Sequence, residues 1–259
     1  MSTRHADPAF ATTLAHGFAV LHCFRFGEAA LSNKALAERT GLSKATISRL
    51  TDTLLLRGLL QHDVQARRYR LGPAVLHLGY PLLADLKVRQ LARPAMTRLA
   101  RYAGGSVSLG MRERMHMVYV ETCRGHDAIA FRPDIGGLLP MLSTAMGRAW
   151  LAQAGEDERA ALLDKLREAH PEQYRHQMEI LARERERLAR NGFCASDGEW
   201  HSDIHAVAVP LPVRIHGNLL VFNCGVPIRR LDRHALHDRV APRLVRLVSR
   251  VARTLESAP

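Results

Sequence analysis

The sequence contains little cysteine, few aromatic residues and no long apolar run. Cys23, Cys123, Cys194 and Cys224 stand far apart in 259 residues. No two of them form a CxxC pair, which argues against a zinc knuckle and a thioredoxin-like site, so we expect reduced, mostly buried thiols. No apolar stretch is long enough to cross a bilayer. The first residues also lack the basic start, apolar core and cleavage site of a signal peptide, and we therefore expect a cytoplasmic protein.

Motifs of common catalytic sites are also absent. The sequence has no P-loop, no GxGxxG motif after a strand and no GxSxG motif. His201, Asp203 and His205 lie close in sequence, but residues four apart in an extended segment are separated by about 13 Å. That separation is too large for shared metal ligation unless the chain turns. We expect neither a bound metal nor a cofactor.

Acidic residues are outnumbered by basic ones. Lys and Arg number 37 against 25 Asp and Glu, which gives a formal net charge of +12. Such a balance favours a polyanionic partner. The excess is spread along the chain, because residues 1–84 hold ten basic and five acidic side chains and the remainder holds 27 and 20. Charge alone therefore does not locate a nucleic-acid surface.

Residues 31–54, LSNKALAERTGLSKATISRLTDTL, contain two short helical patterns separated by one glycine. Ser32 and Ser43 precede the two patterns and suit N-caps. Gly41 suits the left-handed turn between them, because glycine adopts that conformation without steric cost. The spacing is that of a helix-turn-helix, with its core at Leu36, Ala37, Leu42, Ile47 and Leu50. An ordinary helical hairpin in a bundle is the alternative.

A helix-turn-helix places the N-terminal end of its second helix in the major groove of DNA. The start and outer face of that helix supply the predicted DNA-binding residues Ser43, Lys44, Ala45, Thr46, Ser48 and Arg49. Arg49 suits guanine and Ala45 suits a thymine methyl. A phosphate contact or a solvated side chain remains the alternative for each.

The following residues predict the hairpin of a winged helix. Two short extended runs, 59–62 and 67–71, flank a polar turn. Arg67 and Arg68 fall at the tip or on the return strand, where they suit contacts with the DNA backbone or minor groove. The alternative for either arginine is that it only keeps an edge strand soluble.

Helical patterns flank this motif on both sides. We expect a linker helix from about residue 73 to 86 and another from about 88 to 102. Pro81 and Pro94 should break or kink them. The domain boundary is placed near residue 84, which gives domains 1–84 and 85–259. Upstream of the motif, a first helix is predicted to pack through Leu14, Phe18, Leu21 and Phe24.

The second domain has strand patterns at both ends and helical patterns between them. Alternation over residues 106–125 predicts two strands with a turn near 112–114, and a third strand is predicted from residue 127 into a glycine-containing loop. HAVAVPLP and GNLLVFNCGVP predict two more strands, and an amphipathic helix closes the chain. This arrangement predicts an α+β fold whose antiparallel sheet is covered on one side.

Several of these segments together resemble the IclR family of bacterial transcription regulators. The segments are the winged helix, YRLG at 69–72, LPMLSTAMGRAWLA at 139–152, RNGFCASDGEW at 190–200 and HAVAVPLP at 205–212. The resemblance covers about residues 10–255. It implies a winged helix-turn-helix joined by a linker helix to a GAF-like α/β ligand-sensing domain. It also implies a homodimer formed through the N-terminal domains, often doubled to a tetramer.

The resemblance further implies an effector pocket for an organic acid or an aromatic catabolite. It maps the pocket onto Ser143, Thr144, Ala145, Met146, Asp197, Ala206, Phe222 and Cys224. Some relatives that bind small keto acids have cysteine where Ala206 stands and serines on the last strand, so this sequence favours a larger or more apolar effector. Independently, Ser143 and Thr144 mark a helix start whose N–H groups favour a carboxylate. Simple capping is the alternative.

The favoured function is a DNA-binding transcription regulator controlled by a small-molecule effector. Two copies would place their second helices in successive major grooves of a palindromic operator, about 34 Å apart. The alternative is a small-carboxylate enzyme with a winged-helix partner-binding module, whose acid–base residues would be Asp197, Glu199 and His201. A third possibility is a constitutive architectural DNA binder with an empty second domain.

Overall fold

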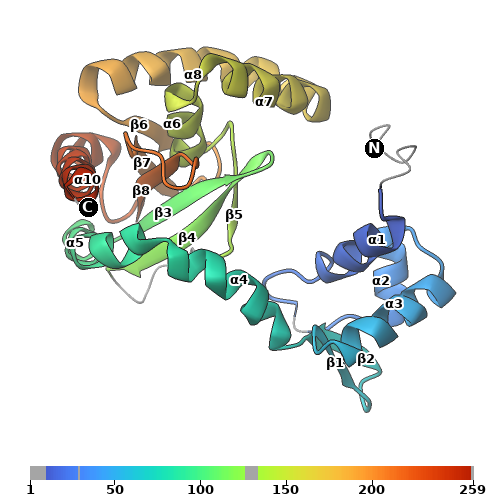
Figure 1. The fold of residues 1–259 in the computed structure, drawn as a ribbon. Coiled ribbons are helices and arrows are strands. Elements are labelled where there is room, and N and C mark those ends of the chain that lie inside the picture. The colour runs from blue at the N-terminus through green and yellow to red at the C-terminus, as the bar shows by residue number, and fades with distance from the viewer. Residues whose placement is uncertain (1–9, 29, 126–133, 258–259) are drawn as a thin grey trace. The chain divides into compact units, whose positions relative to one another are not determined.

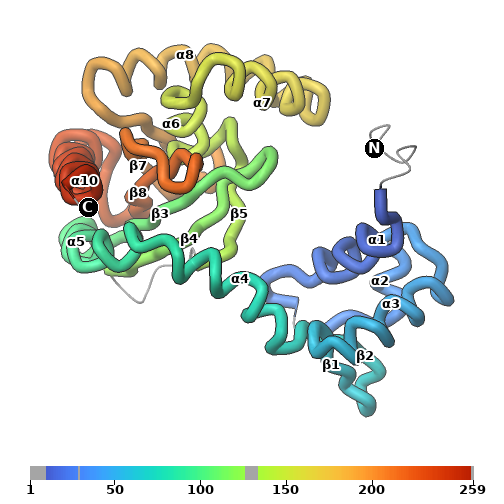
Figure 2. The backbone as a smooth tube through the Cα atoms, in the orientation of Figure 1, coloured from blue at the N-terminus to red at the C-terminus, as the bar shows by residue number. Residues whose placement is uncertain are grey.

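The computed structural model describes residues 10–28, 30–125 and 134–257 (Figure 1). The chain forms two compact units, the first ending at Asp85 and the second beginning at Leu86. Figure 2 follows the backbone through each of them. Among the described residues, no helix has the length and apolarity needed to span a membrane.

The described part of the first unit is a winged helix. Its elements are α1 (Thr12–Leu21), α2 (Asn33–Thr40), α3 (Lys44–Leu56), β1 (Leu60–Asp63), β2 (Arg68–Leu71) and α4 (Ala74–Asp85). β1 and β2 pair as the antiparallel hairpin that the sequence predicts. Leu31, ahead of α2, bridges to Tyr69 and adds a short third strand to the hairpin.

The predicted turn between α2 and α3 is confirmed. The side chains of Ser32 and Ser43 accept hydrogen bonds from the N–H groups of Ala35 and Thr46, and Gly41 has φ 72°. An L side chain in that left-handed conformation costs roughly 1–2 kcal/mol. Gly41 therefore ends α2 and allows α3 to start in a new direction.

The predicted core face of the first helix is partly wrong. Leu14 is 62% and Phe18 is 47% exposed, whereas Val20 is fully buried. Leu21 and Phe24 pack at the margin of the core, and Phe24 lies beyond the end of α1. Apolar residues occur all round this helix, so their spacing does not single out the buried side.

The two helices predicted after the hairpin are confirmed as α4 and α5 (Lys87–Ala103). Pro81 and Pro94 lie inside them, so of the predicted break or kink the break does not occur. Each ring leaves the carbonyl four residues earlier without its helical hydrogen bond. Those carbonyls belong to His77 and Gln90, which are both exposed. Water can therefore donate to them, and the helices continue.

The described part of the second unit contains an antiparallel six-stranded sheet in the order β5-β4-β3-β8-β7-β6. The strands are β3 (Ser106–Glu113), β4 (His116–Arg124), β5 (Leu138–Pro140), β6 (Cys194–Asp197), β7 (Ile204–Pro210) and β8 (Leu220–Pro227). The strand predicted from residue 127 falls partly on 126–133, outside the described residues, and β5 follows the glycines instead of preceding them. The sequence pattern missed β6.

Helices cover both faces of this sheet, so the predicted one-sided cover is wrong (Figure 1). On one face lie α6 (Ala145–Gln153), α7 (Glu156–Ala169) and α8 (Pro171–Asn191). On the other lie α5 and α10 (Ala241–Glu256), the latter preceded by α9 (Arg233–Ala235) and a π-helical turn, Leu236–Val240. β3 and β8 are accordingly buried on both sides along most of their length.

Gly41→Ala should loosen α2 and α3 by about 1 kcal/mol, because alanine must adopt the left-handed turn. Gly79→Ala in α4 is the matched control, since a Cβ at either position meets nothing within 4 Å. Because Gly79 lies inside a helix, Gly79→Ala should stabilise α4 by about 0.5–1 kcal/mol. Amide hydrogen exchange of the α2–α3 and α4 peptides measures both. Equal shifts of the same sign would contradict the role of the turn.

Candidate functional site

The start of α3 presents an exposed polar face. Lys44, Ala45, Ser48 and Arg49 are exposed, whereas Ile47 is fully buried. The predicted orientation of this helix is therefore confirmed, and its contacts with DNA stay a prediction. The hydroxyls of Ser43 and half-buried Thr46 lie 2.9 Å apart, and the Ser43 hydroxyl also accepts from the Thr46 N–H group at 3.1 Å. These bonds fix the backbone at the helix start.

The basic side chains on this face and on the hairpin turn have no carboxylate partner within the described parts of the chain. They are Lys44, Arg49, Arg67 and Arg68. Nearby, Asp63 holds the hairpin turn by accepting from the Ala66 N–H group and from Arg70, at 3.0 and 3.1 Å. The hydrogen bond from Ala66, followed by the charge of Arg70, lowers the pKa of Asp63. Arg67 and Arg68 thus lie at the end of an ordered turn, whereas Lys44 and Arg49 lie on α3.

A pocket opens between the sheet and the start of α6 in the second unit. Strands β3, β4, β7 and β8 form its floor, and the segment after β6 forms its rim. Its lining residues are Ser106, Ser108, Tyr119, Leu139, Thr144, Ala145, Ser196, Trp200, His201, Ile204, Ala206, Asn223 and Gly225. No Lys, Arg, Asp or Glu is among them. The pocket therefore offers hydrogen bonds and apolar walls with no permanent side-chain charge.

Two of its buried polar atoms have no hydrogen-bond partner among the described residues. They are the Ser106 hydroxyl and the Asn223 side-chain oxygen, on side chains whose residues are 5% and 6% exposed. Buried polar atoms are normally paired, so these two are free to bind a ligand. Burial raises the pKa of Tyr119, and its hydrogen bond with Asn223 opposes that shift without cancelling it. Tyr119 therefore remains a neutral hydroxyl at the pocket floor.

The first turn of α6 forms one end of the pocket. The Thr144 hydroxyl accepts from the Gly147 N–H group at 3.1 Å and donates to the Pro140 carbonyl at 2.8 Å. Thr144 is therefore a capping residue, and Ala145 beside it brings the helix start to the pocket wall. A Cβ at Gly147 would lie 2.1 Å from the Met141 carbonyl oxygen. Only glycine lets α6 start so close to the preceding loop.

A buried guanidinium supports the pocket rim. Arg148 is 1% exposed, and its nitrogens donate to the carbonyls of Leu142 and Ala195 at 2.9 Å and to Gln177 at 2.9 Å. It also donates to Glu199 at 3.1 Å, and Glu199 accepts from the hydroxyl of Ser196 at 2.8 Å. Arg148 thereby positions a hydroxyl-bearing residue of the pocket through one intermediate carboxylate.

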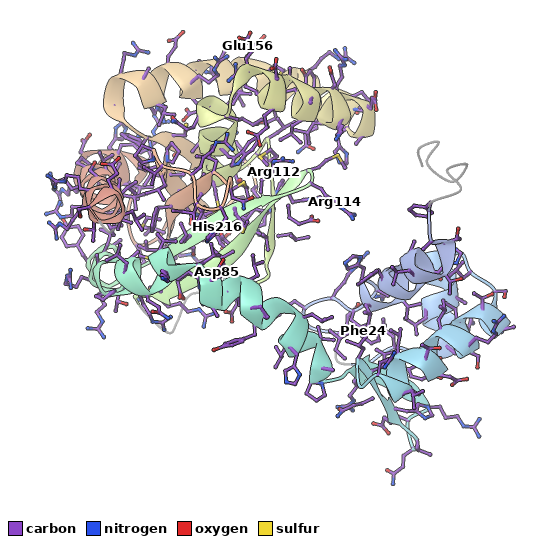
Figure 3. All side chains as sticks on the ribbon, in the orientation of Figure 1. Phe24, Asp85, Arg112, Arg114, Glu156 and His216 are labelled. Atoms are coloured by element: carbon purple, nitrogen blue, oxygen red, sulfur yellow. The ribbon has the colours of Figure 1, made fainter. Side chains whose placement is uncertain are left out.

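The Glu199 carboxylate is charged in this arrangement. Partial burial raises its pKa, but the charge of Arg148 and the hydrogen bond from Ser196 outweigh burial, and the net pKa lies below the ordinary value. A second arginine, Arg112, contacts the same helix as Arg148 (Figure 3). Its guanidinium lies 4.9 Å from the ring centre of buried Trp150 in α6.

The structure brings three of the predicted effector residues to the pocket, namely Thr144, Ala145 and Ala206. Ser143 and Met146 are buried beside it without lining it, and the Ser143 carbonyl accepts from Ser196. Phe222 does not line the pocket, so its ring does not bear on the size of the effector. Tyr119, Trp200 and His201 supply the rings at this pocket.

Three predicted effector residues do not line this pocket, namely Asp197, Phe222 and Cys224. Val221 packs against α6, so alternation turns Phe222 and Cys224 to the face that carries α5 and α10. The Asp197 side chain also lies on that face of the sheet. The pocket positions are each one residue away, at Ser196, Asn223 and Gly225, and such a slip moves a side chain to the other face. The pairing of Ala206 with Ser196 and Gly225 is the signal that finds two of them.

On its own side of the sheet, Asp197 lies between two histidines. Its Oδ1 is 3.4 Å from His205 Nδ1 and 3.7 Å from His237 Nε2. The contact with His237, and then the charge that either ring carries when protonated, lowers the pKa of Asp197. Asp197 therefore faces away from the pocket that His201 lines, and the geometry gives the enzyme alternative no support.

Two family models match the sequence. One, described as the IclR helix-turn-helix domain, matches residues 13–64, and the other, described as the bacterial transcriptional regulator IclR C-terminal, matches residues 81–255. Among curated proteins, the HTH-type transcriptional regulator TsaQ1/TsaQ2 of Comamonas testosteroni is 31% identical over 248 residues. The match covers 95% of this chain and 89% of that protein.

Solved structures of IclR proteins also match this chain. An IclR family transcriptional regulator from Brucella abortus matches with a TM-score of 0.83 and 40% identity, over 98% of this chain and 96% of that one. An IclR homolog complexed with 4-hydroxybenzoate from Microbacterium hydrocarbonoxydans matches with a TM-score of 0.73 and 22% identity, over 93% and 99%. At that identity the second likeness shows the fold alone.

Arg148→Met should cost about 3–5 kcal/mol of stability, because it leaves Glu199 and buried carbonyls without their partner. Arg190→Met is the control, since the Arg190–Glu186 pair is 72% and 69% exposed and should contribute at most about 1 kcal/mol. Urea unfolding measures both. Similar losses in the two variants would show that Arg148 is not the central support of the rim.

Proposed function

The chain belongs to the IclR family of bacterial transcription regulators, and from that premise we propose how its two units divide the work. The protein is a DNA-binding transcription regulator controlled by a small-molecule effector. In the proposal, residues 1–84 bind DNA through α3 and the hairpin turn, and residues 85–259 bind the effector in the pocket beside α6. Its relatives are regulators, which points to a non-enzymatic role.

The DNA contact rests on the exposed start of α3. Lys44 and Arg49 extend from it without a carboxylate partner among the described residues. Entering the major groove with this end, α3 presents Ala45, Ser48 and Arg49 to the base edges, while Ser43, Lys44 and Thr46 lie near phosphates. Arg67 and Arg68 on the hairpin turn reach the flanking backbone.

A homodimer on a palindromic operator completes this mode of binding. An apolar groove in the first unit is lined by α1, α3 and Leu59, and it contains Leu14 and Phe18, which are 62% and 47% exposed. We place the contact between copies on this groove, because burying such side chains favours association. Pairing of two dimers gives the tetramer that the resemblance implies.

The effector that fits the pocket best is a small aromatic or short organic acid. Its carboxylate would meet the N–H groups at the start of α6, which favour anions. Its other polar group would meet the unpaired Ser106 and Asn223 atoms, and its apolar body would lie against Leu139 and Ile204. 4-Hydroxybenzoate, the compound bound to the Microbacterium homolog, is the first probe.

Lys44→Ala and Arg49→Ala should each weaken DNA binding, and each lost phosphate contact should reduce the slope of log affinity against log salt by about 0.9. The probe is a labelled duplex selected from a random library by the unaltered protein. Arg57→Ala, at the exposed far end of α3, is the matched control and should bind normally. Unchanged affinity in both test variants would remove α3 as the DNA-reading helix.

Asn223→Leu should weaken effector binding by roughly tenfold or more, the equivalent of about 1.4 kcal/mol, because it removes a free polar atom and fills the pocket. Cys224→Ala is the control, since Cys224 is next in sequence but faces the other side of the sheet. Thermal shift across a panel of organic acids, starting with 4-hydroxybenzoate, identifies a ligand, and calorimetry gives its affinity. Equal loss of effector affinity in both variants would show that the effector does not bind in this pocket.

A further inference from the structure

The second unit carries an apolar groove on the outer side of α5 and α10, away from the effector pocket. Leu91 and Leu99 of α5 face Leu247 and Val251 of α10 across it. Leu91 is 40% exposed, and Tyr102 at one end of the groove is 52% exposed. The lining spans residues 91–102 of α5 and 243–254 of α10, which is roughly 16 Å of each helix, or three turns.

Four arginines surround this apolar floor. Arg98 belongs to α5, and Arg243, Arg246 and Arg250 recur at helical spacing on α10. No Asp or Glu lines the groove, and among the described residues none of the four guanidinium groups has a carboxylate partner. Arg243 lies 4.1 Å from the centre of the Tyr102 ring and donates to the Arg239 carbonyl, in the π-helical turn that precedes α10. The groove therefore combines apolar surface with unneutralised positive charge.

We propose that this groove is the docking site for an acidic amphipathic helix of a partner protein. The apolar side of that helix packs on exposed Leu91 and Tyr102, above buried Leu99 and Leu247. Its Asp or Glu side chains, on either side of the apolar stripe, meet the four arginines. Helix-in-groove recognition of this kind uses apolar residues at positions i, i+3 or i+4, and i+7. Three turns of groove match such a motif of about 11 residues.

The chemistry favours this partner over DNA and over a second copy. A duplex offers phosphates but no apolar surface to cover Leu91 and Tyr102, so it would leave these exposed apolar side chains in contact with water. A second copy using the same groove would set arginines against arginines, and like charges opposed in an interface are costly. An acidic amphipathic helix covers the apolar floor and also places carboxylates opposite the four arginines.

The test uses the full chain and a fluorescein-labelled peptide with leucines at helical spacing and glutamates on either side of them. Fluorescence anisotropy should show saturable binding at moderate salt. Exposed Arg246→Glu with Arg250→Glu should weaken it by roughly tenfold or more. Arg253→Glu, on the same helix but outside the groove, is the matched control and should keep full affinity. A lysine version of the peptide should bind the double variant better than the unaltered protein.

Other outcomes reject the proposal. If a scrambled peptide of the same composition binds as well, or if Arg253→Glu loses as much affinity, binding depends only on overall charge and not on the groove. Competition by a non-operator duplex that depends on Arg246 and Arg250 would identify a DNA-backbone surface. A change in sedimentation of the double variant without peptide would identify a contact between copies. Operator binding should be unchanged in the double variant, which separates this result from failure of the proposed function.

Discussion

The buried guanidinium of Arg148 is the contact on which the second unit's pocket depends. A guanidinium out of water costs several kcal/mol unless its donors are met. Here they are met by the loop before α6, by β6, by α8 and by Glu199. β6 and α8 lie far from α6 in the sequence, so these bonds form only when the segments have folded together. Ser196 and Trp200, in the segment that holds Glu199, line the pocket, so the requirement to satisfy one buried charge also positions part of the pocket wall.

The sheet relates the pocket to the helices on its other face. Ser106, Ser108 and Tyr119 line the pocket from β3 and β4, and α5 packs on the opposite side of these strands. α5 is also the first element of the second unit, directly after α4. A ligand that prefers one arrangement of β3 and β4 thereby has a physical connection to the chain leading from the DNA-binding unit. It can shift that arrangement only by as much as its affinity differs between the two states.

Local chemistry made the first unit predictable from sequence. Serine caps and a left-handed glycine act on neighbouring backbone groups, so Ser32, Gly41 and Ser43 define the α2–α3 turn without knowledge of the rest of the fold. The core face of α1 was not predictable in the same way, because that helix is apolar on several sides. Which side is buried depends on where α3 lies, and that is a tertiary contact.

The pocket in the second unit was only partly predictable, for a related reason. A strand segment is recognisable from its composition, but its two faces are assigned only by its partners. β8 is buried on both sides, so burial alone does not show which of Phe222 and Asn223 faces the pocket. The cross-strand pairs with β7 and β3 make that distinction. The role of Arg148 could not be predicted from the sequence either, because Gln177 and Glu199 are brought to it only by folding.

This two-sided burial has a consequence for how such a regulator diversifies. Along β8, Asn223 and Gly225 face the cavity, whereas Phe222 and Cys224 pack beneath the other helix layer. Substitutions of Asn223 or Gly225 change the surface that the cavity presents, whereas substitutions of Phe222 or Cys224 change the packing between the sheet and α5 and α10. Adjacent residues of one short strand thus act on different properties of the unit, so the lining of the cavity can change while the packing beneath the strand is kept.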